Sequence, residues 1–130
     1  TQSTISTVYA TIYNGIFDMD MSKFQQGDHN LQATVNSIAH DLSNGILNEE
    51  GEPASGFDYL QDALDIRYLV TSQKDYIGAR VLVAFGGPNI WIDTESKTVE
   101  GYWWGTERFA KYSEDSMEID EALEELWNCS

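Results

Sequence analysis

The sequence predicts one α+β domain spanning residues 1–130, with an antiparallel sheet of about four to five strands and two to three helices packed mainly on one face. The chain has 130 residues, the size of one ordinary domain. Its 42% hydrophobic and 12% aromatic residues suffice for a packed core. Segments with helical and with alternating patterns follow in the order β-α-α-β-β-β-β-α, which lacks the regular βαβ alternation of a parallel sheet.

The first predicted elements are a strand and a long helix. Residues 4–13 alternate β-branched and aromatic side chains with a period of two, which is typical of a strand. Residues 17–26 are predicted to form an acidic loop. Apolar residues then recur at helical spacing over 31–46, with Asp28 or Asn30 as the N-cap, and Asn44-Gly45 marks the end of the helix.

A shorter helix is predicted over residues 56–64. Phe57, Leu60 and Leu64 would share one stripe of this helix. Asp58, Asp62 and Asp65 would share another stripe and form an acidic ridge. The preceding segment, 48–56, contains three glutamates and a proline and is predicted to be an exposed connection.

The middle of the chain has the β-branched density of strands at 67–71, 77–85, 90–92 and 99–104. Turns are predicted at 86–89 and 93–98, and Gly105 should end the last strand. A final helix should open at Ser116 with acidic residues in its first turn, and six apolar residues from Met117 to Trp127 can pack inward.

The net charge is the unusual feature of the sequence. Twenty-two acidic and seven basic side chains give −15, far more than solubility requires. The acid excess is expected to run along the whole chain and to decorate the folded surface. Such a field repels nucleic acid and anionic membranes and attracts basic protein surfaces. Halophilic adaptation, or a helix face that is simply solvated, is the alternative interpretation.

The strongest candidate for a binding surface is the last helix with the segment before it. No basic residue lies between residues 112 and 130, and like charges four apart, such as Glu121 and Glu125, destabilise a helix slightly. We therefore expect partner binding by three sets of acids: Glu114, Asp115, Glu118, Asp120, Glu121, Glu124 and Glu125; Asp58, Asp62 and Asp65; and Glu95 and Glu100.

Trp103 and Trp104 complete the expected binding residues. Neighbours in a strand point to opposite faces, so the two rings should not enter one core, and one of them should face outward. An exposed tryptophan beside acidic residues is typical of an interface anchor. An aromatic sheet face could also pair two copies, so a monomer and a homodimer are both open.

The sequence offers little for catalysis, and no enzyme, metal or cofactor is expected. No serine or cysteine nucleophile with a base is indicated, and no Cys/His set could bind zinc. Glu95-Ser96-Lys97, with Asp75 upstream, formally matches the Glu-x-Lys element of a class of metal-dependent nucleases. Because it falls in a predicted turn instead of a strand, it is the minor alternative.

Three segments resemble parts of small acidic proteins carried by phages and mobile elements of Firmicutes: residues 84–94, 99–104 and 119–129. The resemblance covers about the last third of the chain. It implies a setting in which small anionic proteins often act as counter-defence factors. The single cysteine, Cys129, allows no internal disulfide, and no run of about 18 apolar residues occurs, so the cytoplasm of the bacterial host is the expected location.

The function expected from these features is inhibition without catalysis. The carboxylates would mimic DNA phosphates and occupy the basic surface of a nucleic-acid-binding protein, such as a CRISPR effector or restriction enzyme. The alternative is an immunity protein that neutralises a cognate nuclease toxin by the same electrostatics.

Overall fold

The fold was analysed in a computed structural model, which describes the backbone of residues 21–130 and the side chains from residue 30 onward. An antiparallel sheet and three helices confirm the α+β class. The elements are α2 (Met21–Asn44), α3 (Gly56–Leu60), β1 (Asp65–Val70), β2 (Tyr76–Ala84), β3 (Asn89–Asp93), β4 (Thr98–Trp103), β5 (Thr106–Lys111) and α4 (Ile119–Asn128).

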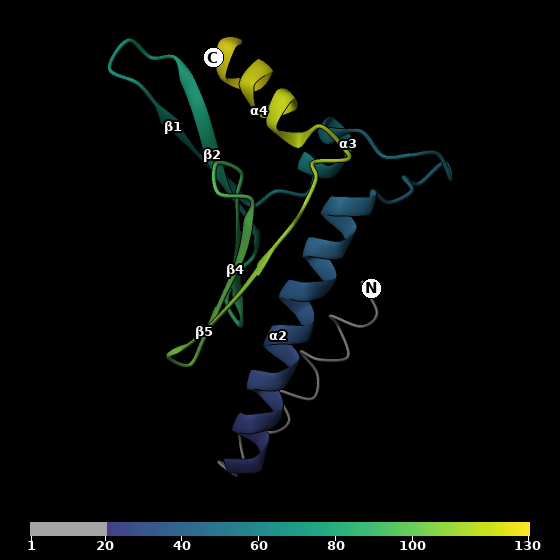
Figure 1. Ribbon diagram of the computed structural model, residues 1–130, viewed down its shortest axis with the longest axis vertical. Coiled ribbons are helices and arrows are strands. Elements are labelled where there is room, and N and C mark those ends of the chain that lie inside the picture. Colours follow the sequence, from purple (N-terminus) through teal and green to yellow (C-terminus); the bar gives the residue numbers. More distant parts are fainter. Residues whose placement is uncertain (1–20) are drawn as a thin grey trace.

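The five strands form one meander in sequence order, β1-β2-β3-β4-β5, with every neighbouring pair antiparallel (Figure 1). Burial alternates along β3 and β4, as expected for a sheet with one face in the core. Ile90, Ile92 and Val99 are almost fully buried, whereas their neighbours along the strands, Trp91 and Glu100, are half-buried. The pattern separates a core face from a more accessible face.

Helix α2 packs against the core face beside β4 and β5. Its residues Leu31, Val35 and Leu42 are buried, as their spacing predicts. Gly101 makes the close approach feasible, because a Cβ atom there would lie 2.8 Å from side-chain carbons of both Leu31 and Val35. Only glycine fits under the helix at this point.

Helix α4 contacts β2 at the other end of the sheet and also contacts α3 (Figure 1). Ile119, Ala122 and Leu123 of α4 are buried in the same core cluster as α2 and the central strands. Whether the helices lie mainly on one face stays a prediction.

Residues 113–116 tie α4 to the C-terminal end of α2. The Ser116 hydroxyl donates to the Ser43 carbonyl, and the Ser116 amide donates to the Leu42 carbonyl. These bonds satisfy carbonyls that the end of a helix leaves without partners. Ser116 therefore closes α2 and does not open the last helix, which begins at Ile119.

The N-terminal predictions are only partly within the described residues. The predicted strand at 4–13 and residues 17–20 lie outside them. Residues 21–26, predicted as a loop, belong to α2, so Asp28 and Asn30 lie inside the helix and do not cap it. This stretch contains methionine, lysine and glutamine, which are good helix formers.

The predicted helix over 56–64 is wrong in length. It ends at Leu60, and the Leu64 amide already donates to the Leu82 carbonyl as the chain turns into β1. Of the expected stripe, Leu60 is buried, whereas Phe57 and Leu64 are 44% and 60% exposed. The acidic ridge does not form either, because Asp65 is the first residue of a strand.

The end of the sheet also differs from the prediction, because a fifth strand follows Gly105. Trp104 and Gly105 both have positive φ angles and join β4 to β5 as a two-residue hairpin loop. The other turns agree with the prediction: Asn89 Oδ1 accepts from the Gly86 amide, and Asp93 Oδ1 accepts from the amides of Glu95 and Ser96.

Candidate functional site

The negative charge is not spread over the whole chain, which corrects the sequence-based expectation. The sheet with its turns, residues 65–112, contains six acidic and six basic side chains and is neutral overall. Residues 1–64 and 113–130 together hold the other sixteen acids and a single base, Lys23, which accounts for the full −15. The anionic surface therefore belongs to the parts of the chain outside the sheet.

Five exposed glutamates at α4 form the clearest anionic feature, which we call the α4 acidic surface: Glu114, Glu118, Glu121, Glu124 and Glu125. Glu118, Glu121 and Glu125 have helical spacing and share one face. Among the described residues, two ion pairs lie within 4.0 Å, Arg67–Asp65 and Arg80–Glu100, and both belong to the sheet. Among the described side chains, no cation lies within 4.0 Å of a carboxylate of the α4 acidic surface.

The glutamates of this surface repel one another. The pKa of Glu121 is raised, first by the negative charge of Glu118 and then by a hydrogen bond with the same residue. Asp115 and Asp120 add smaller repulsive contributions. A raised pKa on an exposed carboxyl is the mark of like charges held close together without a neutralising partner.

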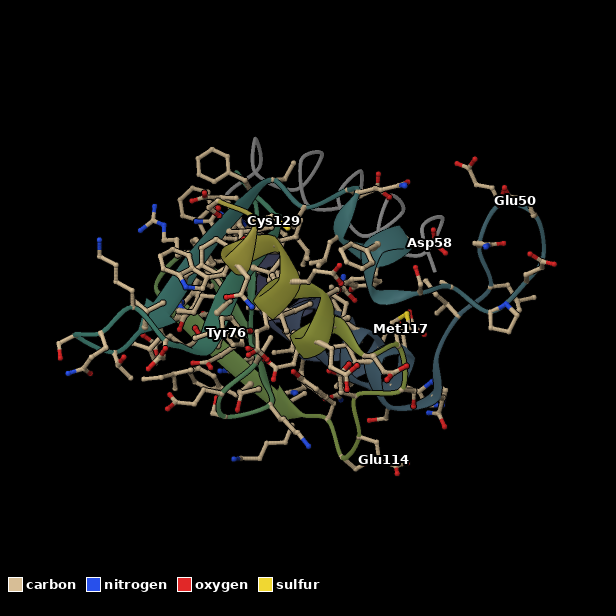
Figure 2. The ribbon with its side chains drawn as sticks, turned by 90° about the horizontal axis from the view of Figure 1, so that it is seen from above. Glu50, Asp58, Tyr76, Glu114, Met117 and Cys129 are labelled. Carbon is tan, nitrogen blue, oxygen red and sulfur yellow. The ribbon has the colours of Figure 1, made fainter. Side chains whose placement is uncertain are left out.

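Asp115 and Asp120, also expected to bind a partner, have structural roles in α4. The Asp115 carboxylate accepts hydrogen bonds from the amides of Ile119 and Asp120, 2.9 Å each, and so caps the helix. Asp120 accepts a 2.6 Å bond from the Tyr76 hydroxyl, which joins α4 to β2 near the labelled Tyr76 in Figure 2. Burial, followed by this bond, raises the pKa of Tyr76.

The three aspartates of the expected ridge are separated by the structure. Asp58 forms a capping box with Ser55 at the start of α3, and its amide hydrogen bonds keep its pKa below the usual range. Asp65 pairs with Arg67 on β1. Asp62 is exposed in the turn after α3.

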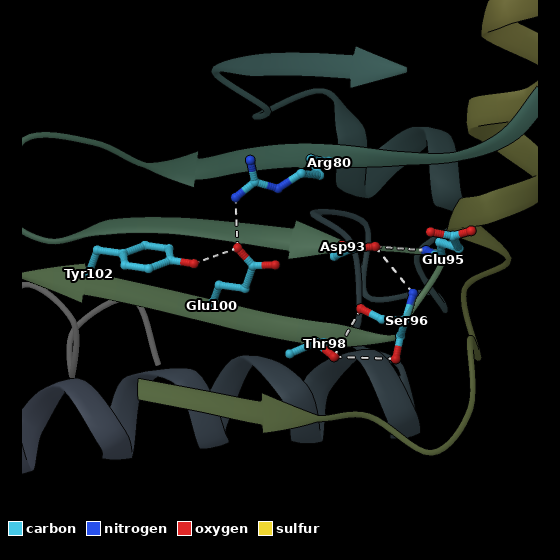
Figure 3. A network of polar contacts seen from close by, with 7 residues as sticks. All are labelled: Arg80, Asp93, Glu95, Ser96, Thr98, Glu100 and Tyr102. Atoms are coloured by element: carbon cyan, nitrogen blue, oxygen red, sulfur yellow. Dashed lines mark hydrogen bonds and ion pairs between the residues drawn. The ribbon is translucent and has the colours of Figure 1, made fainter. Parts of the chain in front are cut away.

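Glu100 is occupied by contacts within the sheet (Figure 3). One of its oxygens accepts from Arg80 Nη2 at 2.7 Å and from the Tyr102 hydroxyl at 2.8 Å. Burial and then the bond to Glu100 raise the pKa of Tyr102 to about 12. Arg80 also lies 4.6 Å from the ring centroid of Trp91, and Arg67 lies 5.2 Å from it.

Trp103 and Trp104 are brought together at the tip of the β4–β5 hairpin. Their ring centroids are 6.0 Å apart in an edge-to-face arrangement. Trp104 is 57% exposed, which agrees with the expectation that one ring faces outward, but it lies in the turn and not in a strand. Phe109 on β5, 49% exposed, adds a second exposed aromatic ring at this edge of the sheet, whereas Trp103 is half-buried.

The structure gives the nuclease alternative no metal site. Glu95 and Lys97 are exposed in the turn between β3 and β4, and Asp75 is exposed before β2. Among the described side chains, from residue 30 onward, no group of three or more His, Cys, Asp or Glu residues is arranged to hold a metal ion. In the described part of the chain, no helix has the length and apolar character needed to cross a bilayer.

Comparisons with family models, curated proteins and solved structures found no match for this chain. Its function has to be inferred from its own residues.

Proposed function

We propose that the protein is a non-enzymatic inhibitor that binds the basic surface of a nucleic-acid-binding protein, a CRISPR effector or a restriction enzyme, with its carboxylates in place of DNA phosphates. The observation that carries this proposal is the α4 acidic surface, five exposed glutamates with no ion pair among the described side chains, where repulsion also raises the pKa of Glu121. Selection for stability alone would have placed a lysine among these glutamates. A basic groove would relieve their repulsion on binding, so the unneutralised stripe favours a cationic partner.

The buried side of α4 makes this surface rigid enough for recognition. Ile119 and Leu123 are 3% and 0% exposed, and the Trp127 ring lies against Tyr68 at a centroid distance of 5.2 Å. Trp127 Nε1 also donates to the Lys74 carbonyl at 2.9 Å. Carboxylates held on such an anchored helix lose little conformational freedom when a partner binds.

The first prediction concerns the charge of this surface. Reversal of Glu118, Glu121 and Glu125 to lysine should abolish capture of a DNA-binding nuclease from lysates of bacteria that carry restriction or CRISPR systems. Capture by the wild-type chain should be strong at about 50 mM salt and lost at about 300 mM, because the contacts are ionic. The readout is the captured protein and the inhibition of its DNA cleavage.

The matched control is Glu52→Lys/Asp75→Lys/Glu107→Lys, which makes the same change in net charge at three exposed acids outside α4. It should retain most of the inhibition. Equal loss in both triple variants would mean that net charge alone matters, and the absence of any nucleic-acid-binding protein at low salt would contradict the proposal. Recovery of a secreted nuclease toxin would instead identify an immunity protein.

A further inference from the structure

A pocket lies between the C-terminal end of α2, the loop of residues 46–54, α3 and the end of the β2–β3 hairpin. Its volume is about 610 Å³, within the range typical of ligand-binding pockets. Glu50, on the projecting loop, and Asp58, at α3, mark its two sides in Figure 2. It shares no lining residue with the α4 acidic surface.

Half of the described residues that line the pocket have apolar side chains. Ile38 and Ile90 are buried and form its base. Phe85 and Leu47 also line it but are 75% and 66% exposed, the two most exposed large apolar side chains among the described residues. Large apolar side chains that face solvent around a pocket are typical of a binding site.

The other lining residues give this apolar pocket a negative charge. Asp41, Glu49, Glu50 and Asp62 contribute carboxylates, and the described lining contains no Lys, Arg or His. Asp58 also lines it, and its Oδ2 accepts hydrogen bonds from the Ser55 amide and from Asn48 Nδ2. Asp41 is half-buried, and its burial raises its pKa, with His40 opposing the shift. A cationic group of a ligand would stabilise the ionised form of this partly desolvated carboxylate.

Tyr59 supplies a hydrogen-bond donor to the same pocket. Burial, followed by the charge of Asp41, raises the pKa of Tyr59 above its ordinary value, which already leaves the hydroxyl protonated at neutral pH. Its hydroxyl takes part in none of the hydrogen bonds found within the described part of the chain. Tyr59 is half-buried, and a peptide carbonyl from a ligand could provide an acceptor for its O–H group.

The loop that forms one wall is held in place by its own hydrogen bonds. Asn48 Oδ1 accepts from the amides of Glu50 and Glu52, and the Asn48 amide donates to the Glu52 carbonyl. Leu47 and Pro53 form a β-bridge at the base of the loop. The wall is therefore organised before a ligand arrives, which lowers the entropic cost of binding.

We propose that this pocket binds a basic amphipathic peptide segment of a partner protein. An apolar side chain of the peptide enters between Leu47 and Phe85, and an adjacent lysine or arginine contacts the carboxylate of Asp41. A backbone carbonyl of the peptide accepts a hydrogen bond from Tyr59. This inference does not depend on the proposed function, because the pocket and the α4 acidic surface are separate sites.

The test is a fluorescence titration of the full chain with a labelled dodecapeptide that alternates leucine and arginine, at about 150 mM salt so that long-range attraction is screened. Asp41→Asn/Asp62→Asn should weaken binding at least about tenfold, the equivalent of one ion pair of moderate strength. Glu121→Gln/Glu125→Gln, with the same charge change at α4, should alter it less than about twofold. Equal weakening by both pairs would overturn the proposal.

A second pair of variants tests the apolar contact without risk to the fold. Phe85→Ser replaces a side chain that is 75% exposed and should weaken the peptide several-fold, whereas Phe109→Ser, 49% exposed on β5, should not. A peptide with serine in place of leucine should bind at least about tenfold more weakly than the leucine peptide. If the serine peptide binds as well as the leucine peptide, attraction is purely ionic and no pocket is used.

Discussion

Glu118 lies close enough to Glu121 for its charge to raise the pKa of Glu121, although both side chains are exposed. The backbone contributes to this closeness. Glu118 precedes the first residue of α4 with a φ of +58°, an unusual conformation for a residue other than glycine, and this directs the chain into the helix. The repulsion is thus a fixed property of the folded chain.

The second prediction follows from the sign of this pKa shift. Glu118→Gln should lower the pKa of Glu121 towards the ordinary value, because it removes the largest cause of the shift. A carboxyl whose folded pKa is raised destabilises the fold above that pKa and ceases to do so as pH falls through it. The variant should therefore be more stable than wild type at pH 7 and equally stable well below the pKa of Glu121.

NMR titration of the Glu121 side chain, with urea unfolding at both pH values, measures these effects. Glu107→Gln removes the charge of an exposed glutamate on β5 and should leave the titration of Glu121 unchanged. An unaltered Glu121 titration in Glu118→Gln would show that the two charges do not interact.

At the scale of elements, α4 depends on a cap that lies four residues before its first turn. Asp115 accepts from two amides of that turn, and the same segment closes α2 through Ser116. One short connection thus completes the ends of two helices. Both helices bury residues in the same core, so loss of the connection should weaken the whole domain.

The third prediction tests this cap. Asp115→Ala leaves two amides without acceptors and should lower the free energy of unfolding by about 1 kcal/mol, the usual value of an N-cap. Asp115→Asn keeps an acceptor oxygen and should recover most of the loss. Urea unfolding followed by circular dichroism is the measurement, and equal stability of the alanine variant and wild type would contradict the role of Asp115.

The long helix α2 and most strands were predictable from the sequence, whereas β5 and the end of α3 were not. The core positions of α2, from Leu31 to Leu42, and most of the sheet follow from spacing alone. The sequence did not predict β5, because the charged residues Glu107, Arg108 and Lys111 interrupt the alternation of apolar and polar side chains that is typical of a strand. The helix predicted at 56–64 was too long. Apolar residues spaced three to four apart over nine residues do not reveal where the chain leaves the helix and begins to pair with β2.

The candidate site was predictable in composition but not in contacts. The absence of bases from 112 to 130 pointed to α4 at once. The bond between Arg80 and Glu100 joins residues on two strands that flank β3, so it requires the register of the sheet. The pocket brings together four separate segments, which no spacing along the chain could indicate.

The whole molecule carries a charge of −15 with 22 acids, and its stability should depend on ionic strength. The fourth prediction is that the melting temperature rises as sodium chloride increases from about 10 to about 300 mM, because screening reduces self-repulsion. The variant Glu118→Lys/Glu121→Lys/Glu125→Lys should melt higher at low salt and respond less to salt. Differential scanning calorimetry measures both, and a melting temperature independent of salt would show that the charges are too dispersed to interact.

The neutral sheet and the anionic remainder of the chain give the molecule an electric dipole as well as a net charge. Six of the seven bases lie within residues 67–111, on the sheet or its turns, and the seventh, Lys23, lies on α2. In the field of a large cationic partner, such a molecule experiences a torque as well as a pull. It can therefore turn its helices towards the partner before the two surfaces touch, so that fewer encounters begin in an unproductive orientation.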